Sequence, residues 1–571
     1  MNFQSLPTDS KTILAFQWTD YEPYYNNLKT RELNKENIEA WLKDWSRLAE
    51  TVDEHYWRLN IATTVNTASK EYEDQFNQYI EQIQPSAKAA EQGLKDKLLA
   101  SGLSPKSFET GLRMMRAEAE IFTEKNLPLL GEEQKLVTEY NKMIGSLSVQ
   151  WEGEERTLTQ MFPLQYETDR SIRQRAWETT HSRLIQERQH INELWEKFVP
   201  VRLKIAENAG MPDYRAYAWK QKFRFDYTPE DCRSFHAAIE AVVVPAAKRV
   251  YEKRRQRLRL DALRPWDLHV DPFGAKPIKP YETIDELKSK SRAVFEHVDP
   301  KFGEYFQIMM DEGLLDLDSR KNKAPGAYSL GLHAIHRPFI FMSSANTPWD
   351  VQTILHEGGH AFHEFERAQV HFYQRGEIYL PAEFAEVASM GMELIASPYK
   401  TKEFGGFYTE EEATRAMIDH LEGNITFWPY MALVDAFQHW IYENPKDGSV
   451  ASKCEEKWAE LWDLFMPGID YSGLEDAKKT YWHRQSHIFQ IPFYYVEYGL
   501  AQLGAVQVWA NARKDQKKAV AAYRRALSLG ATVPLPELFA AAGAKFAFDA
   551  NTLKEAVDLM EEVIGETESR L

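Results

Sequence analysis

Helical periodicity is the feature that most restricts the folds open to this 571-residue chain. From about Asn34 to Gln160, apolar residues recur every three or four positions, which predicts long amphipathic helices separated by short breaks. The stretch from Glu71 to Ile83 is an example, and its apolar stripe consists of Tyr72, Phe76, Tyr79, Ile80 and Ile83. Helical patterns begin again near Glu167 and near Ser486. The chain is therefore predicted to be mainly α-helical.

Local signals mark a few element boundaries. Thr228-Pro229-Glu230-Asp231 predicts a helix start, with a capping threonine, a proline at the first helical position and acidic residues in the first turn. Strand signals are scarce, and the best is Pro338 to Met342, a short apolar run that begins with proline as an edge strand does. We expect a region of helices over residues 1–165 and a catalytic region over 166–571.

The charge balance argues against two classes of partner. The chain has 69 basic and 86 acidic residues, a formal net charge of −17, which disfavours general binding to nucleic acid or to anionic membranes. One basic run, Lys248 to Arg259, has helical spacing and is interpreted as a solvated helix face rather than a nucleic-acid patch. No stretch approaches the roughly 18 apolar residues of a membrane span.

Cysteine usage points to a reducing compartment. The only two cysteines, Cys232 and Cys454, are far apart in sequence and form no C-x-x-C pair, so a disulfide framework is not expected. The N-terminal residues also lack the pattern of a secretion signal. A cytoplasmic location is the expectation.

The most informative motif is His356-Glu357-Gly358-Gly359-His360. On a helix, histidines four positions apart project from the same face, so both rings can bind one zinc ion while Glu357 reaches a water activated by the metal. A helix is expected here, because Thr347-Pro348-Trp349-Asp350 reads as a capped start. Each glycine costs a helix about 1 kcal/mol relative to alanine, so we expect a substrate chain or a neighbouring helix to pack closely against Gly358 and Gly359.

A catalytic zinc ion takes three protein ligands and keeps its fourth position for water. Downstream, Glu383, Glu386, Met390 and Glu393 share one helical face. Like charges at this spacing repel, so the face is expected to meet a cation or hydrogen-bond donors. The third ligand is therefore expected among these glutamates, and their spacing does not separate Glu383 from Glu386. Glu393 is expected to accept a hydrogen bond that orients a histidine ring.

These residues resemble the thimet oligopeptidase family, and more closely its oligoendopeptidase F and Pz-peptidase members. The similarity covers roughly the last half of the chain, and its segments are Gly326-Ala327-Tyr328-Ser329, Pro338 to Met342, His356 to His363, Ala385 to Ser389, and His487 to Ala501. The resemblance implies Glu386 as the third ligand and a two-lobed helical shell around a deep substrate channel. A small β-sheet would lie next to the zinc-binding helix.

The resemblance also implies residues that hydrogen-bond the substrate carbonyl. His487 and Tyr498 match those positions, and Tyr494 and Tyr495 are neighbours on the same turn. The chain departs from the thimet pattern where Ile491-Pro492-Phe493 replaces a glycine-flanked tyrosine, which leaves open which tyrosine acts.

The predicted function is a one-zinc oligoendopeptidase that cuts internal bonds of short peptides. Glu357 would act as the general base, and the substrate backbone would pair with the exposed edge of the Pro338 to Met342 strand. The residues expected to bind substrate are Gly326, Tyr328, Phe339 and Ile340.

Two other functions remain open at the level of sequence. A helical zinc carboxypeptidase or dipeptidyl carboxypeptidase can share the same ligands. A peptide-binding protein with a structural metal would need a fourth protein ligand, for which His363 is the available residue. The oligomeric state is open.

Overall fold

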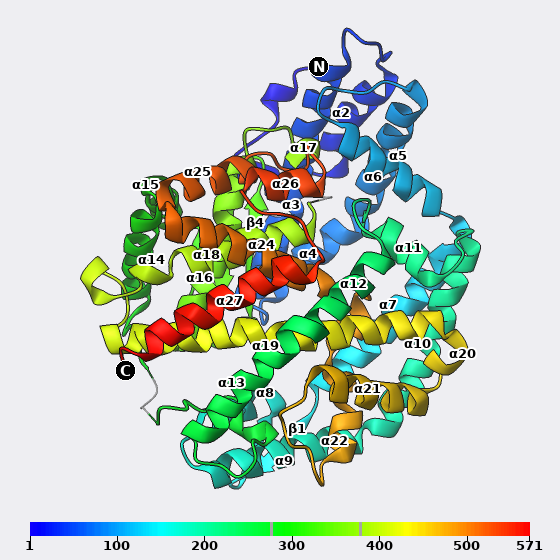
Figure 1. Cartoon of the computed structure of the whole chain (residues 1–571). Helices are drawn as coiled ribbons and strands as arrows, with labels where there is room; N and C mark the ends of the chain where they lie inside the picture. The colour runs from blue at the N-terminus through cyan, green and yellow to red at the C-terminus, as the bar shows by residue number, and fades with distance from the viewer. Residues whose placement is uncertain (275–277, 376–379) are drawn as a thin grey trace. The chain divides into compact units, whose positions relative to one another are not determined.

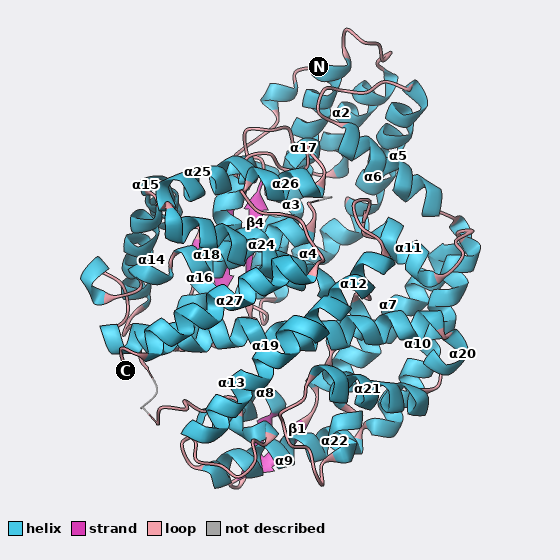
Figure 2. Ribbon diagram, in the orientation of Figure 1, coloured by secondary structure: helices cyan, strands magenta, loops and turns pink. Residues whose placement is uncertain are grey.

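The computed structural model describes residues 1–274, 278–375 and 380–571, and helices dominate it (Figure 2). This confirms the predicted fold class. The chain forms two compact units, each assembled from three segments. The first unit contains residues 1–117, 278–416 and 501–546, and the second contains residues 118–277, 417–500 and 547–571. No helix of the described residues combines the length and apolarity that crossing a membrane requires.

Most helices of the two units are labelled in Figure 1. Those lying wholly in the first unit are α1 (Ser10–Ala15), α2 (Trp18–Thr30), α3 (Ile38–Val65), α4 (Lys70–Gln82), α5 (Gln84–Ser101), α14 (Ile284–Val298), α15 (Pro300–Asp311), α16 (Pro348–Arg367), α17 (Phe372–Arg375), α18 (Ala382–Ile395), α25 (Gln516–Leu527) and α26 (Leu535–Ala541). Those lying wholly in the second are α7 (Leu127–Gly145), α8 (Leu158–Met161), α9 (Arg170–Gln186), α10 (Arg188–Asn208), α11 (Tyr214–Gln221), α12 (Pro229–Ala238), α13 (Val244–Arg257), α20 (Pro445–Gly448), α21 (Ala451–Phe465), α22 (Glu475–Lys479), α23 (Ser486–Gln490) and α27 (Ala550–Glu568). Three helices contribute residues to both units: α6 (Glu109–Ile121), α19 (Glu410–Glu443) and α24 (Tyr495–Lys514).

A three-stranded sheet supports α16 in the first unit. Its strands are β3 (Leu315–Asp316), β4 (Ala327–Leu332) and β5 (Arg337–Met342), in the order β3-β5-β4. β5 pairs antiparallel with β4 along its whole length and parallel with β3 at Ile340 and Phe341. Both β4 and β5 pack against α16. The predicted small sheet beside the motif helix is thereby confirmed.

One segment predicted as helix is instead a β-hairpin. β1 (Ser148–Trp151) pairs with β2 (Glu154–Thr157), although the spacing of apolar residues predicts helix as far as Gln160. The two turn residues, Glu152 and Gly153, both have positive φ, which is the geometry that a tight two-residue hairpin turn requires. The turn chemistry and the packing of Trp151 in a small buried cluster therefore outweigh the weak helical pattern.

The predicted regions 1–165 and 166–571 follow the order of the sequence, whereas the compact units combine distant segments. The regions remain a proposal about where catalytic residues lie along the chain. The basic run lies mainly on α13, where Arg249 pairs with Glu561 at 2.8 Å and Lys253 pairs with Glu568 at 3.2 Å, both on α27. These ion pairs show that part of the run packs against α27, and Arg254 is buried, so the face is only partly solvated.

Buried histidines should make the fold sensitive to mild acid. Burial, with a smaller contribution from the charge of Arg484, lowers the pKa of His181 to about 3. In the unfolded chain this histidine binds a proton near pH 6.5, whereas in the folded chain it stays neutral down to about pH 3. The free energy of unfolding therefore falls as pH drops from 6.5 toward 3. We expect His181→Gln to reduce the pH dependence of the unfolding free energy by up to about 1.4 kcal/mol per pH unit below 6.5.

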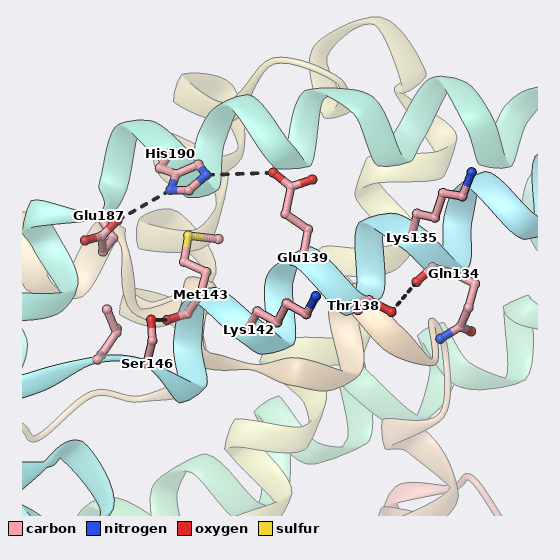
Figure 3. A pocket seen from close by; sticks show the side chains of 10 residues that line it. Gln134, Lys135, Thr138, Glu139, Lys142, Met143, Ser146, Glu187 and His190 are labelled. Atoms are coloured by element: carbon pink, nitrogen blue, oxygen red, sulfur yellow. Dashed lines mark hydrogen bonds and ion pairs between the residues drawn. The ribbon is translucent and has the colours of Figure 1, made fainter. Parts of the chain in front are cut away.

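Urea unfolding at several pH values measures this slope. The control is His190→Gln, because the His190 side chain is 53% exposed in a surface hollow lined by residues of α7 and α10 (Figure 3). Equal slopes for the wild type and His181→Gln would contradict the assignment.

Candidate metal centre

Helix α16 presents the motif histidines. It begins as predicted at Pro348, with a capping box in which Thr347 and Asp350 satisfy each other's backbone N–H groups. The apolar side chains beside the motif are buried, and they are Val351, Ile354, Leu355, Phe362 and Phe365. His356 and His360 lie one turn apart with ring centroids 4.9 Å from each other. Packing of the apolar stripe thus sets the direction of both imidazoles.

Neighbouring helices account for the two glycines of the motif. A Cβ atom on Gly359 would lie 2.4 Å from the carbonyl oxygen of Ala388 and 2.6 Å from Cα of Ser389, so the backbone of α18 occupies that space. A Cβ on Gly358 would lie 2.4 Å from Cζ of Phe295 on α14. Of the two alternatives left open by the sequence, the close approach of a helix is the one observed. Figure 1 shows α16 and α18 side by side.

This close approach brings a glutamate to the histidines. One ligand atom from each of His356, His360 and Glu386 lies within 4.8 Å of the other two. Glu386 Oε2 is 3.4 Å from Nε2 of His356 and 3.6 Å from Nε2 of His360. Glu383 is buried but is not a member of the group. Geometry therefore separates the two glutamates that spacing left equivalent.

Hydrogen bonds hold these side chains in place. Nδ1 of His356 donates to Oε1 of Glu393 at 2.6 Å, which leaves Nε2 facing Glu386. The amide of Gln352 donates to the second oxygen of Glu393. Ser389 donates to Oε2 of Glu386 at 2.9 Å. Orienting partners of this kind fix the ring and carboxylate positions of metal sites.

Sequence reasoning missed Gln352, although a signal for it was present. Gln352 lies four residues before His356, and this spacing places both side chains on one helical face.

The electrostatics of the cluster favour a positive charge at its centre. Burial lowers the pKa of His356, but the bond to Glu393 and the charges of nearby carboxylates raise it more, to about 9. Burial raises the pKa of Glu357 to about 7, and it also raises the pKa of Glu386. Burial together with the charge of His356 lowers the pKa of His360. A divalent cation would provide the charge that these buried carboxylates favour.

The donor set fits zinc. With Zn–N and Zn–O bonds of about 2.0–2.2 Å, ligand atoms around a tetrahedral ion lie roughly 3–4 Å apart. The separations of 3.4 and 3.6 Å measured here fall in that range. His363 is buried near Phe384 and does not belong to the ligand group found among the described residues. Two imidazoles and one carboxylate form the three-ligand set that is typical of catalytic zinc.

The predicted carbonyl-binding residues cluster together in the second unit. The His487 ring centroid is 4.9 Å from that of Tyr495, 6.0 Å from that of Tyr498 and 6.1 Å from that of Tyr494. The Gln485 amide lies 2.7 Å from Nδ1 of His487. Burial lowers the pKa of His487 to about 4, with a further contribution from Lys222. A neutral ring that accepts at Nδ1 carries its proton on Nε2, so His487 can donate a hydrogen bond.

The predicted substrate edge requires a correction. Residues Pro338 to Met342 belong to β5, which is the central strand, so the expectation of an exposed edge there is wrong. Pro338 lies opposite Gly331 of β4, two residues before the pairing with β3 begins at Ile340. Because backbone N–H groups alternate sides along a strand and that of Ile340 donates toward the β3 side, the missing N–H of Pro338 falls where β3 makes no pairing. β4 is an edge strand of this sheet, and it contains Tyr328 and follows Gly326. Ile340 is fully buried and Phe339 is 9% exposed.

Close packing at Gly359 gives a prediction. Gly359→Ala would place a methyl group inside the backbone of α18, and overpacking of this kind costs about 1–3 kcal/mol. We expect lower stability and reduced metal content, because Glu386 lies on the displaced helix. The matched control is Gly391→Ala on α18, where the nearest atom would be an ordinary 3.5 Å away. Urea unfolding and metal analysis test the pair, and indistinguishable variants would contradict the packing argument.

Comparison with known proteins places this geometry in a family. The profile of Peptidase family M3 matches residues 163–558. An oligoendopeptidase F homolog of Mycoplasma genitalium is 25% identical over 54% of this chain and 50% of that protein. The oligopeptidase PepF of Bacillus subtilis is 27% identical over 57% of this chain and 48% of that protein. The chain thus spans about half the length of these relatives.

Solved structures match over nearly the full length. Pz peptidase A, solved with an inhibitor, is 26% identical with a TM-score of 0.84, and the match covers 99% of both chains. A structure assigned as an oligoendopeptidase F is 27% identical with the same TM-score and coverage. The family match covers more than half of the chain and includes the motif helix, α18 and the His487 cluster. The chain belongs to Peptidase family M3, whose peptidases are metallopeptidases.

Proposed function

We propose that this protein is a zinc-dependent oligoendopeptidase that hydrolyses internal bonds of short peptides. The observation that carries the proposal is the ligand group of His356, His360 and Glu386, whose ligand atoms lie within 4.8 Å of one another. Glu357 lies between the two histidines on the same helix and outside the ligand group. Three ligands with an adjacent carboxylate suit hydrolysis better than a closed structural site.

Each group at the candidate site has a separate role in the proposed hydrolysis. Bound zinc would polarise the scissile carbonyl and lower the pKa of water. Glu357 accepts the proton of the attacking water and returns it to the leaving amine. Glu393 holds His356 in the orientation that ligation needs.

The proposal also includes hydrogen-bond donors for the substrate carbonyl oxygen, which gains negative charge during the reaction. The Nε2 proton of His487 and the hydroxyl of Tyr498 stabilise the carbonyl oxygen as it gains charge, and Tyr494 and Tyr495 support them. Burial raises the pKa of Tyr495, so this hydroxyl keeps its proton.

Substrate binding is proposed at the edge strand β4. An extended peptide adds to a sheet edge through backbone hydrogen bonds, which demand little of its sequence. Gly326 has a φ of +99°, a conformation that suits glycine, and it leads into this strand. The Tyr328 ring stacks on Phe341 with centroids 4.8 Å apart, and its hydroxyl lies 2.7 Å from that of Thr64. Phe339 and Ile340 hold β4 in place from the adjacent strand. A cytoplasmic location remains part of the proposal.

Peptides blocked at both ends test the proposal. We expect fluorogenic peptides with acetylated N-termini and amidated C-termini to be cut internally when short, whereas long substrates and folded proteins are spared. A chelator should abolish cleavage and zinc should restore it. Cleavage that requires a free C-terminus would support a carboxypeptidase instead. A zinc-loaded protein that cuts no peptide would support a binding role.

A further inference from the structure

A second group of potential metal ligands is buried in the second unit. It consists of Cys232 and His236 on α12 with Asp435 and His439 on α19. The two residues of each pair are four positions apart, so each helix presents its two side chains on one face. Their exposed fractions are 0% for Cys232 and Asp435, 7% for His236 and 3% for His439. None of the four belongs to the catalytic group, which lies in the first unit.

The distances within this group suit a single ion. One ligand atom from each of Cys232, Asp435 and His439 lies within 4.8 Å of the other two. Oδ2 of Asp435 is 3.4 Å from Nε2 of His439. Oδ2 also lies 2.8 Å from Nε2 of His236. Zn–S and Zn–N bonds of about 2.3 and 2.0 Å require ligand atoms roughly 3–4 Å apart, so small side-chain movements suffice.

Unsatisfied polar atoms indicate that a partner is expected here. Among the described residues, neither ring nitrogen of His439 has a hydrogen-bond partner, and neither does Oδ1 of Asp435. Leaving a buried polar group unsatisfied costs about 1–3 kcal/mol. The His439 ring also lies between aromatic neighbours, 5.2 Å from Phe493 and 5.7 Å from Trp219. A buried His–Asp–His network would account for His236 and for the 3.4 Å contact between Nε2 of His439 and Asp435, but it leaves Nδ1 of His439 without a hydrogen-bond partner among the described residues.

We propose that Cys232, Asp435 and His439 bind a second zinc ion, with His236 orienting the carboxylate of Asp435. A thiolate, an imidazole and a carboxylate are all zinc ligands, and thiolate selects against magnesium and calcium. A thiolate and a carboxylate also neutralise the two charges of the ion, which suits a buried site. The hydrogen bond from His236 matches the support that ligating carboxylates receive elsewhere.

The helix that carries Cys232 and His236 has a well-defined start and an irregular turn close to the group. α12 starts at Pro229 with a capping box between Thr228 and Asp231, as the sequence predicted. It continues into a π-helical turn, Ile239–Val243, and then α13, which Figure 1 shows as one continuous helix. Pro245 lacks the N–H that an α-helical turn would need, and single π turns of this kind occur frequently at functional sites. An ion bound by these three side chains would link α12 to α19.

Cobalt spectroscopy tests the second site without relying on activity. The catalytic group contains no cysteine, so thiolate-to-cobalt charge-transfer absorption would report binding outside that group, at a cysteine. We expect this absorption when the metal-stripped full-length protein is loaded anaerobically with two equivalents of Co²⁺. It should persist in His356→Ala, which impairs the catalytic site alone, and disappear in Cys232→Ser. Direct metal analysis should give two zinc ions per wild-type chain and one in His356→Ala.

The second cysteine provides a matched control. Cys454 is also buried in the second unit, where its thiol donates to the carbonyl of Gly448, so Cys454→Ser should keep the absorption. Absence of the band in the loaded wild type would overturn the proposal without any variant. Its persistence in Cys232→Ser would overturn it as well. Failure of the catalytic proposal would appear separately, as absent peptide cleavage in a protein that shows the band.

Discussion

Glu357→Gln is expected to lower kcat by about 10²–10⁴-fold while the protein keeps its metal. Glutamine has nearly the same shape but cannot accept the proton of the attacking water. Because glutamine has this similar shape and Glu357 lies outside the ligand group, the substitution should disturb neither folding nor binding of the ion. Turnover of a blocked fluorogenic peptide and metal content measured on the same preparation give the answer.

A conservative variant controls for this substitution. Glu357→Asp keeps a carboxylate at a shorter reach, so it should retain more activity than Glu357→Gln. Near-normal turnover in Glu357→Gln would refute the assigned base. Loss of metal in that variant would show that Glu357 acts on binding rather than on proton transfer.

The second large effect concerns metal binding, because substitutions of three glutamates on α18 should change the metal affinity by very different amounts. Glu386→Gln removes the carboxylate ligand and should abolish retention of the ion held by His356 and His360 during dialysis against a mild chelator. Glu393→Gln weakens only the support of His356 and should lower affinity by about 10–100-fold. Glu383→Gln should retain metal like the wild type, because Glu383 is outside the group.

Competition with a chromogenic chelator ranks the three variants. The order of metal loss should be Glu386→Gln, then Glu393→Gln, then Glu383→Gln. Metal loss from Glu383→Gln with retention in Glu386→Gln would reverse the ligand assignment. Circular dichroism of each variant checks that α18 remains folded.

Most of the fold class could be predicted from periodicity. A long amphipathic helix needs only one buried face, and the spacing of its apolar residues can be read from the sequence. The capped starts at Thr347 and Thr228 were predictable for the same reason, since both capping partners lie within three residues. The hairpin at Ser148–Thr157 was not predicted, because four-residue strands carry too few positions for alternation to show.

Local sequence patterns could not predict the order of the strands in the sheet. A proline at the start of Pro338 to Met342 suggested an edge, but β5 is flanked by β3 and β4. β3 contributes only two residues to the pairing, and no spacing along the chain reveals that contact. Substrate binding at β4 is therefore a proposal that depends on the position of this strand at the edge of the sheet.

The sequence by itself determined that two imidazoles and a carboxylate of the candidate metal centre share one helix, because residues four or fewer positions apart are related by helical geometry alone. Tertiary structure decided which glutamate meets them, since the backbone of α18 reaches Gly359 and turns Glu386, not Glu383, toward the histidines. It also brought Cys232 within reach of Asp435 and His439, which lie some 200 residues away in the sequence. Contacts between distant segments depend on the packing of whole helices, and no local spacing encodes them.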